Sequence, residues 1–284
     1  MSTSTLSIAD QRVLWRAACT LERESLVARL SELTGEPVTQ LLRMMPKIMS
    51  RRIHGAVQSA LWRALQVALY KMDSGFPEPG TAGFKVMSGI TGGVSGFFGV
   101  ATLAVELPVT TTLMLRSIAG IARKEGEDLR YPGARLACLE VFALGQRTGD
   151  RENAGASAEA SYYAIRAVLA KTVSEAARVF AERTVAQRSS PIIVDLLTAL
   201  GSRFGLVVSE KVAAGAIPVV GAIGGAAVNL AFMEHFQKLA QAHFAIRRLE
   251  REHGPEEVHR VYEKYAEIVR ERAARAKSRR VTKS

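Results

Sequence analysis

Hydrophobic residues recur at helical spacing along most of the chain, and no stretch alternates between apolar and polar residues for long enough to predict a strand. Segments 7–33 and 38–72 each read as amphipathic helices, with Pro46 expected to kink or split the second. Glycines at 201–205 are expected to interrupt a later helical stretch. Further helices are predicted over 134–143, 159–187, 192–199, 234–253 and 256–276.

Two uncharged runs, 86–105 and 212–233, carry glycines three or four residues apart. On a helix these glycines share one side, where another backbone can approach closely. The glycines predicted to make helix-packing contacts are Gly89, Gly92, Gly93, Gly96, Gly221 and Gly225. We therefore predict an all-α, multi-helix single domain built around two glycine-rich apolar helices.

Both runs reach the roughly 20 residues that a bilayer-spanning helix needs. Their small residues, together with Pro218 and Asn229 in the second run, argue against spanning. A helix buried on all sides in a soluble protein has the same composition. We favour a soluble or peripheral protein with both runs buried, and the alternative is that one or both insert as a hairpin.

Two polar residues, Glu106 and Asn229, lie within or beside these apolar runs. Because a buried carboxylate needs a partner or a proton, we hypothesise that both meet in the core together with Arg116 or His235. These four residues are the candidate ligand-binding or polar-core residues. The group either fixes the helix register or forms a ligand or proton site.

The chain carries a formal net charge of +11, which indicates an acidic partner such as anionic lipid or nucleic acid. Segment 41–52 mixes Met and Leu with cations, as a membrane-surface helix does. The alternative for this segment is a helix buried through its Met and Leu side, with its cations in solvent. The C-terminal cations predicted to contact a membrane or another anionic surface are Arg270, Arg272, Arg275, Lys277, Arg279, Arg280 and Lys283.

No recognised catalytic or cofactor motif is present. His235 and His243 stand about 12 Å apart along one helix, too far to share a metal ion from that helix alone. Cys19 and Cys138 are isolated, and neither a phosphate loop nor a GxSxG elbow occurs. We expect no metal and no cofactor, and a catalytic residue cannot be assigned. The N-terminus lacks the pattern of a secretory signal, so a cytoplasmic location is expected.

Several separated blocks, in order, give the chain a family resemblance. They include ELPVTTT at 106–112, LEVFALG at 139–145, SYYAIR at 161–166 and RRLE at 247–250. Through these blocks the segment 61–254 resembles the bacterial EcsC protein family, which takes its name from a protein encoded beside an ABC transporter. The resemblance implies a bacterial, membrane-related context and brings no established reaction or active site.

We predict an N-terminal helical segment at 1–60, an EcsC-like helical domain at 61–254, and a C-terminal helix with a basic tail at 255–284. The predicted function is that of a non-catalytic, membrane-associated accessory protein that binds lipid or an acyl chain. It would lie peripheral to, or partly inserted in, the inner membrane, with a membrane transporter or another membrane protein as a candidate partner. The alternatives are a hydrolase with a site near Glu106 and His235, and a nucleic-acid binder that uses the basic tail.

Overall fold

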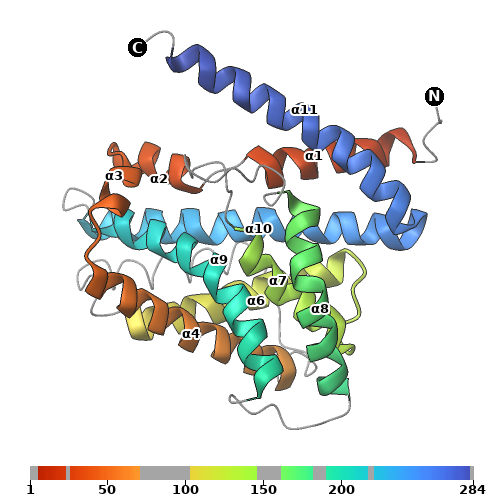
Figure 1. Ribbon diagram of the computed structural model, residues 1–284, viewed down its shortest axis with the longest axis horizontal. Helices are drawn as coiled ribbons and strands as arrows, with labels where there is room; N and C mark the ends of the chain where they lie inside the picture. Colours follow the sequence, from red (N-terminus) through yellow and green to blue (C-terminus); the bar gives the residue numbers. More distant parts are fainter. Residues whose placement is uncertain are drawn as a thin grey trace.

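The computed structural model describes residues 6–23, 26–70, 103–145, 161–181, 190–216 and 221–281. Within these ranges it contains ten α-helices and no strand, which confirms the predicted all-α fold (Figure 1). The helices are α1 (Ile8–Arg23), α2 (Leu26–Thr34), α3 (Val38–Arg43), α4 (Lys47–Tyr70), α6 (Leu103–Lys124), α7 (Pro132–Leu144), α8 (Tyr162–Ala181), α9 (Pro191–Gly215), α10 (Gly221–His253) and α11 (Pro255–Val281).

Prolines and one glycine set several helix boundaries. Pro46 separates α3 from α4, so the predicted split of segment 38–72 is confirmed. Pro132 and Pro191 begin α7 and α9, where the missing backbone N–H is not needed. Gly254 has φ near 87° between α10 and α11, a conformation that a side chain would strain.

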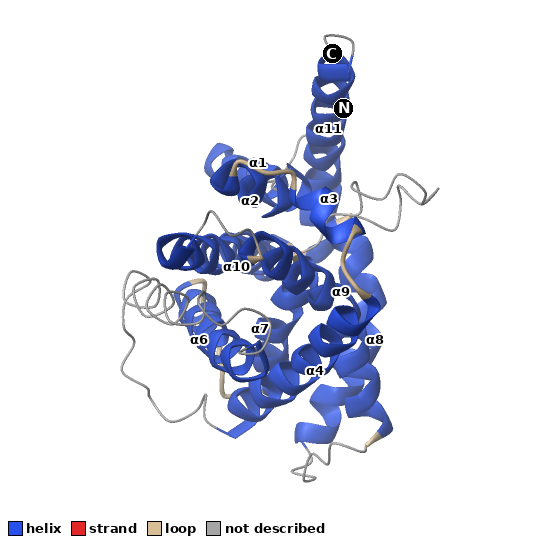
Figure 2. Cartoon of the chain, turned by 90° about the vertical axis from the view of Figure 1, so that its left-hand side faces the viewer, coloured by secondary structure: helices blue, strands red, loops and turns tan. Residues whose placement is uncertain are grey.

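Helix α10 forms the axis of the molecule. Its 33 residues extend over about 50 Å. Helices α1, α2 and α11 pack on one side of it, while α6, α7 and α9 pack on the other (Figures 1 and 2). Phe236 of α10 lies with its ring centroid 5.5 Å from that of Phe142 in α7 and 5.6 Å from that of Phe204 in α9. The core therefore gathers around the middle of α10.

Helix α9 runs without interruption from Pro191 to Gly215, so the predicted break at 201–205 is wrong. The physical reason is a close helix contact. A Cβ atom at Gly201 would lie 3.0 Å from the side-chain amide nitrogen of Gln58 in α4, against which α9 packs. Gly201 is therefore a packing residue within the helix, because tertiary contacts outweigh its weak helix propensity.

The two glycine-rich runs do not appear as a described helix pair. The run 212–233 is not one helix, since α9 ends at Gly215 and α10 begins at Gly221, with Pro218 between them. Most of the run 86–105 lies outside the described residues.

The same boundaries place the predicted packing glycines. Gly221 begins α10, and Gly225 lies in its second turn. The other four, Gly89, Gly92, Gly93 and Gly96, lie outside the described residues. Their predicted helix contact therefore stays a prediction.

Candidate functional site

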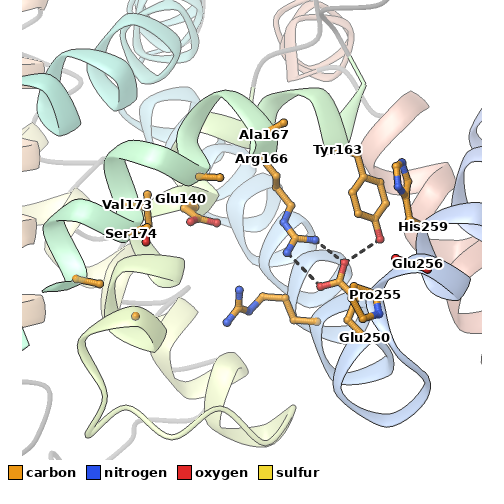
Figure 3. Close-up of a pocket in the computed structure, with 14 residues that line it drawn as sticks. Glu140, Tyr163, Arg166, Ala167, Val173, Ser174, Glu250, Pro255, Glu256 and His259 are labelled. Carbon is orange, nitrogen blue, oxygen red and sulfur yellow. Dashed lines mark hydrogen bonds and ion pairs between the residues drawn. The ribbon is translucent and has the colours of Figure 1, made fainter.

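A pocket of about 670 Å³ lies between α7, α8, α10 and the start of α11 (Figure 3). This volume is within the range of small-molecule sites. One wall is apolar and comes from α8, whose residues Ala167, Ala170, Val173 and Ala177 recur every three or four positions and so share one side of the helix. The pocket is therefore an apolar surface beside a group of charged side chains.

The charged group at the α10–α11 end is centred on Glu250. Arg166 of α8 donates to both its carboxylate oxygens, with distances of 2.7 Å from Nη1 to Oε1 and 3.1 Å from Nη2 to Oε2. The hydroxyl of Tyr163 donates to the same Oε1 at 2.8 Å, and the ring of His259 lies 4.0 Å from the Tyr163 ring. The forked geometry of the pair ties α8 to α10 and leaves the Arg166 charge balanced.

A second chain of contacts runs beneath the pocket. Arg166 Nη1 donates to the hydroxyl oxygen of Tyr162 at 3.3 Å, and the Tyr162 hydroxyl lies 3.0 Å from His243 Nδ1. This arrangement directs the hydroxyl proton to Nδ1 and assigns the imidazole proton to Nε2. His243 Nε2 is 3.9 Å from Oε2 of Glu140, a pocket-lining carboxyl that forms no hydrogen bond with the described residues.

Burial decides the protonation of this pair. It lowers the pKa of His243 well below the ordinary value, and the cations Arg166 and Arg247 lower it further. Burial also raises the pKa of Glu140, although Arg247 and Arg166 oppose the rise. Near neutral pH the imidazole is therefore neutral, and the carboxyl of Glu140 holds its proton to higher pH than an exposed glutamate does.

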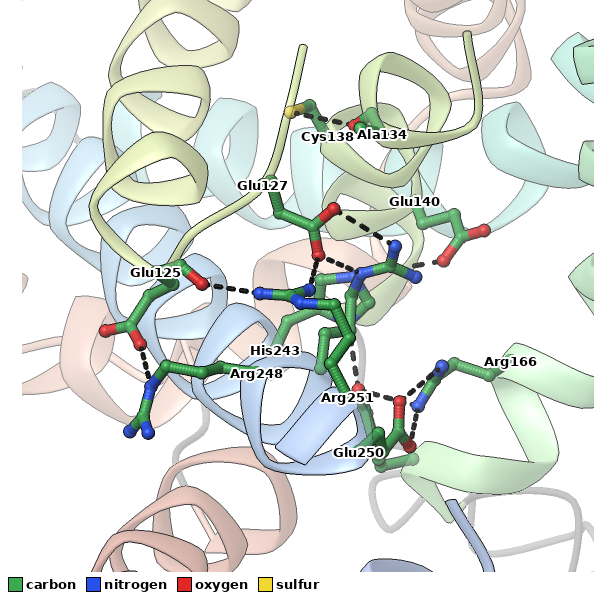
Figure 4. A network of polar contacts seen from close by, with 12 residues as sticks. Glu125, Glu127, Ala134, Cys138, Glu140, Arg166, His243, Arg248, Glu250 and Arg251 are labelled. Carbon is green, nitrogen blue, oxygen red and sulfur yellow. Dashed lines mark hydrogen bonds and ion pairs between the residues drawn. The ribbon is translucent and has the colours of Figure 1, made fainter. Parts of the chain in front are cut away.

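Beside the pocket, two guanidinium groups share one carboxylate (Figure 4). Arg247 donates to both oxygens of Glu127, at 2.8 and 3.3 Å, and Arg251 donates to the same carboxylate and to the backbone oxygen of Glu125. Burial raises the pKa of Glu127, but the hydrogen bonds and charges of Arg247 and Arg251 outweigh it, so the net shift is downward. The cluster carries one more cation than it has carboxylates to balance.

The structure places Glu106 in an ion pair with Lys211, which the sequence did not suggest. Lys211 Nζ of α9 lies 2.5 Å from Glu106 Oε1 of α6, and both side chains are mostly buried. Lys211 also stands over the ring of Phe232, 5.2 Å from its centroid. Glu106 therefore has the charged partner that a buried carboxylate needs, and the pair joins α6 to α9.

The other three predicted polar residues lie on α6 and α10. Asn229 is fully buried on α10, and Arg116 is half-buried on α6. His235 of α10 donates from Nε2 to the backbone oxygen of Gly145 at 3.0 Å. Glu106 thus pairs with a residue outside the predicted group, and His235 bonds to a backbone oxygen outside it.

The predicted basic tail is helical up to Val281 and projects from the body of the molecule (Figure 1). Its first residues contact α1, because Arg270 Nε lies 3.7 Å from Glu22 Oε2 and Arg272 lies over the ring of Trp15. Arg275 lies 3.4 Å from Glu271. The side chains of Lys277, Arg279, Arg280 and Lys283 lie outside the described part.

Within the described residues, one group has the geometry to hold a metal ion. The ligand atoms of Asp10, Glu252 and His253 lie within 4.8 Å of one another where α1 meets the end of α10. Asp10 already accepts the Ser7 hydroxyl at 2.6 Å, and Glu252 accepts Arg248 at 3.1 Å. These bonds account for the acidic group without an ion.

Together, the fold and the pocket define an all-helical protein with a partly apolar cavity over a buried polar network. The sequence model of the EcsC protein family matches residues 14–249, and the chain belongs to this family. The predicted family membership is thereby confirmed, and the match starts earlier than the segment 61–254 that carries the resemblance. No curated protein and no solved structure gives a significant match.

Sequence reasoning missed the residues that form the pocket and its network. Several of their polar residues come from the blocks LEVFALG, SYYAIR and RRLE that carry the family resemblance, whereas the apolar wall of α8 and the residues of α11 lie outside these blocks. These polar residues are Glu140, Tyr162, Tyr163, Arg166, Arg247 and Glu250. The available signal was the appearance of these polar residues among helix-forming apolar ones within the blocks.

Proposed function

We propose that this EcsC family member is a non-catalytic accessory protein that associates with an anionic membrane surface and binds lipid or an acyl chain. Membrane association rests on the exposed segment 43–52, where α3 meets α4, here called the basic corner. Two apolar side chains stand out from it into solvent: Met44 is 78% exposed and Ile48 is 64% exposed.

The basic corner combines the two contributions that hold a protein at a bilayer surface. Its cations Arg43, Lys47, Arg51 and Arg52 are all exposed. Near an anionic leaflet each contributes about 1 kcal/mol, and apolar side chains that enter the headgroup region add their own burial. The neighbouring Met45 and Met49 pack against the core, so this segment is anchored to the fold while Met44 and Ile48 face outward.

Peripheral attachment accounts for the fold better than insertion does. Helix α9 is the one helix in the described part that is long and apolar enough to cross a bilayer. However, α4, α7 and α8 pack against it, as helices do around a core helix. The predicted place is therefore the cytoplasmic side of the inner membrane, and a membrane transporter or other membrane protein stays a predicted partner.

The geometry gives little support to the hydrolase alternative. Glu106 is engaged by Lys211, and His235 is bonded to a backbone carbonyl. These contacts favour a structural role for both residues.

Sedimentation with vesicles tests the membrane proposal. The wild-type chain should pellet with phosphatidylcholine vesicles that contain phosphatidylglycerol and stay in solution with phosphatidylcholine alone. The double variant Met44→Ser/Ile48→Ser should lose most of the binding. The matched control is Ile8→Ser/Val168→Ser, which removes two side chains that are 72% and 66% exposed elsewhere. Equal binding of both double variants, or no pelleting of the wild type, would exclude the basic corner.

A further inference from the structure

The pocket between α7, α8, α10 and α11 is a separate feature from the basic corner. Its apolar wall on α8 extends from Ala167 to Ala177, about 15 Å along the helix axis. A single aliphatic chain lying along this wall would contact small side chains that leave room for it. The charged and aromatic side chains of Arg166, Glu250 and Tyr163 lie at one end of this wall, so the pocket is amphipathic (Figure 3).

Two pocket-lining groups have hydrogen-bonding capacity that the described protein leaves unused. Arg247 donates from Nε and Nη2 to Glu127, and its Nη1 forms no hydrogen bond with the described residues. The Glu140 residue is only 8% exposed, yet its carboxyl has no hydrogen bond there, with His243 Nε2 at 3.9 Å. Both residues line the pocket, so a ligand head placed there can form hydrogen bonds with them.

The lining also holds the carboxylate of Glu256 on α11, so the sign of a ligand head placed between Arg247 and Glu140 follows from the charges next to those two residues. Arg166 is balanced by Glu250, whereas Arg247 and Arg251 share the single carboxylate of Glu127. A protonated Glu140 adds no charge and can donate a hydrogen bond. A cationic head would face Arg247 directly, and an anionic head would accept from both Arg247 and Glu140.

We propose that this pocket binds a single-chain amphiphile with an anionic head group, the chain along α8 and the head between Arg247 and Glu140. The inference rests on the proposed lipid-binding function and gives it a site and a ligand class. The chemistry is shared by a free fatty acid and by a phosphate-headed lipid with one chain. Because the pocket and the basic corner are different surfaces, the two proposals can fail separately.

Calorimetric titration of the full-length chain tests the ligand class. The probes are dodecanoate, dodecyl phosphate, dodecanol and dodecyltrimethylammonium, each below its micelle concentration. Dodecanoate or dodecyl phosphate should bind, with the preferred one identifying the head group, and the other two should bind at least roughly tenfold more weakly, as a site with unpaired polar groups discriminates. Equal or tighter binding of the cationic probe would overturn the inference.

A pocket-filling variant locates the binding. Ala170→Phe places a ring on the exposed apolar wall and should weaken binding of the anionic probe by roughly tenfold or more. The control Val168→Phe adds the same ring to α8 at an exposed position that does not line the pocket. Unchanged binding by Ala170→Phe, with both variants showing wild-type circular dichroism, would place the ligand elsewhere.

The head-group position is tested by pH. Above the pH at which Glu140 ionises, binding of the anionic probe to the wild type requires that Glu140 take up a proton. The affinity should therefore fall by up to about tenfold per pH unit in that range. Glu140→Gln keeps a donor without a charge, so its binding should lose this dependence. The charged groups that act on Glu140 are Arg247 and Glu250 of α10, Arg166 of α8, and Glu127, while Glu256 and His259 of α11 line the other end of the pocket (Figure 3). Identical pH profiles would remove Glu140 from the site.

Vesicle sedimentation of the same variants separates the two proposals. Ala170→Phe should still pellet with anionic vesicles, because the basic corner is intact. If the wild type binds the amphiphile but not the vesicles, the pocket proposal stands and the membrane proposal is excluded. If the wild type binds the vesicles but not the amphiphile, the membrane proposal stands and the pocket proposal is excluded.

Discussion

At the scale of single residues, Gly145 shows how closely the helices around α10 approach one another. Its backbone oxygen accepts the imidazole of His235, and a Cβ atom at this position would lie 3.0 Å from two ring carbons of Phe236 and 3.1 Å from Val207. Its φ of −65° is ordinary, so the demand for glycine comes from packing and not from the backbone. A methyl group here has to displace a ring that is fully buried.

We therefore expect Gly145→Ala to lower the free energy of unfolding by about 1–3 kcal/mol, the usual cost of overpacking a core. Gly205→Ala is the matched control, because it lies within α9 and no atom comes within 4 Å of the added Cβ. That change should stabilise the helix by about 0.5–1 kcal/mol. Urea denaturation measures both. A Gly145→Ala protein as stable as the wild type would show that the Phe236 ring moves freely.

The raised pKa of Glu140, caused by burial and opposed by Arg247 and Arg166, makes stability depend on pH. The folded state holds the proton above the ordinary value of 4.5, at which the unfolded chain loses it. Wild-type stability thus falls as pH rises from there to the folded pKa. Glu140→Gln removes this titration. The free energy of unfolding of the variant should therefore rise relative to that of the wild type across this pH window, and below the window the difference should not change with pH. Parallel stability curves from pH 4 to 8 would contradict the assignment.

At the scale of elements, ion pairs join helices that the sequence separates widely. Lys211 and Glu106 are 105 residues apart and link α9 to α6. Breaking a buried pair leaves one charge without compensation, which typically costs about 3–5 kcal/mol. We expect Glu106→Gln and Lys211→Met each to destabilise by that order, and the double variant by less than their sum. The exposed pair Arg275 and Glu271 is the control, since Glu271→Gln should change stability by about 1 kcal/mol or less.

The thermal unfolding midpoints of the four proteins in this cycle measure the coupling. Strict additivity would mean that Glu106 and Lys211 stabilise the fold independently. Destabilisation without any change in vesicle binding would favour the structural role of Glu106 over the ligand site that its sequence position also allowed.

The helices themselves could be predicted because their signals are local. Periodic apolar residues and the prolines at 46, 132 and 191 lie within the segments they shape. Gly201 misled the prediction because its reason for being glycine is Gln58, on another helix. The pocket network could not be predicted for the same reason. Arg166 and Glu250 are 84 residues apart and Glu127 and Arg247 are 120 apart, and spacing along the chain does not reveal such partners.

At the scale of the whole molecule, two basic regions could meet an anionic membrane. One is the C-terminal sequence with cations at 277–283, which follows from α11 as that helix projects from the body, and the other is the basic corner at the junction of α3 and α4 (Figure 1). The tail offers charge alone, whereas the corner adds Met44 and Ile48. Salt distinguishes them, because the Debye length falls from about 8 Å at 0.15 M to 3 Å at 1 M while apolar burial is not screened.

Deleting residues 277–284 should weaken binding to anionic vesicles at low salt, and the difference from the wild type should shrink as salt rises. Met44→Ser/Ile48→Ser should stay weaker than the wild type at every salt concentration at which binding is measurable, because its loss is apolar. Gel shifts with DNA and RNA on the same proteins test the nucleic-acid alternative. If the truncated chain alone loses vesicle binding, the tail and not the corner contacts the membrane. If the wild type shifts nucleic acid at 0.15 M salt and the truncated chain does so less, the tail supports the nucleic-acid alternative.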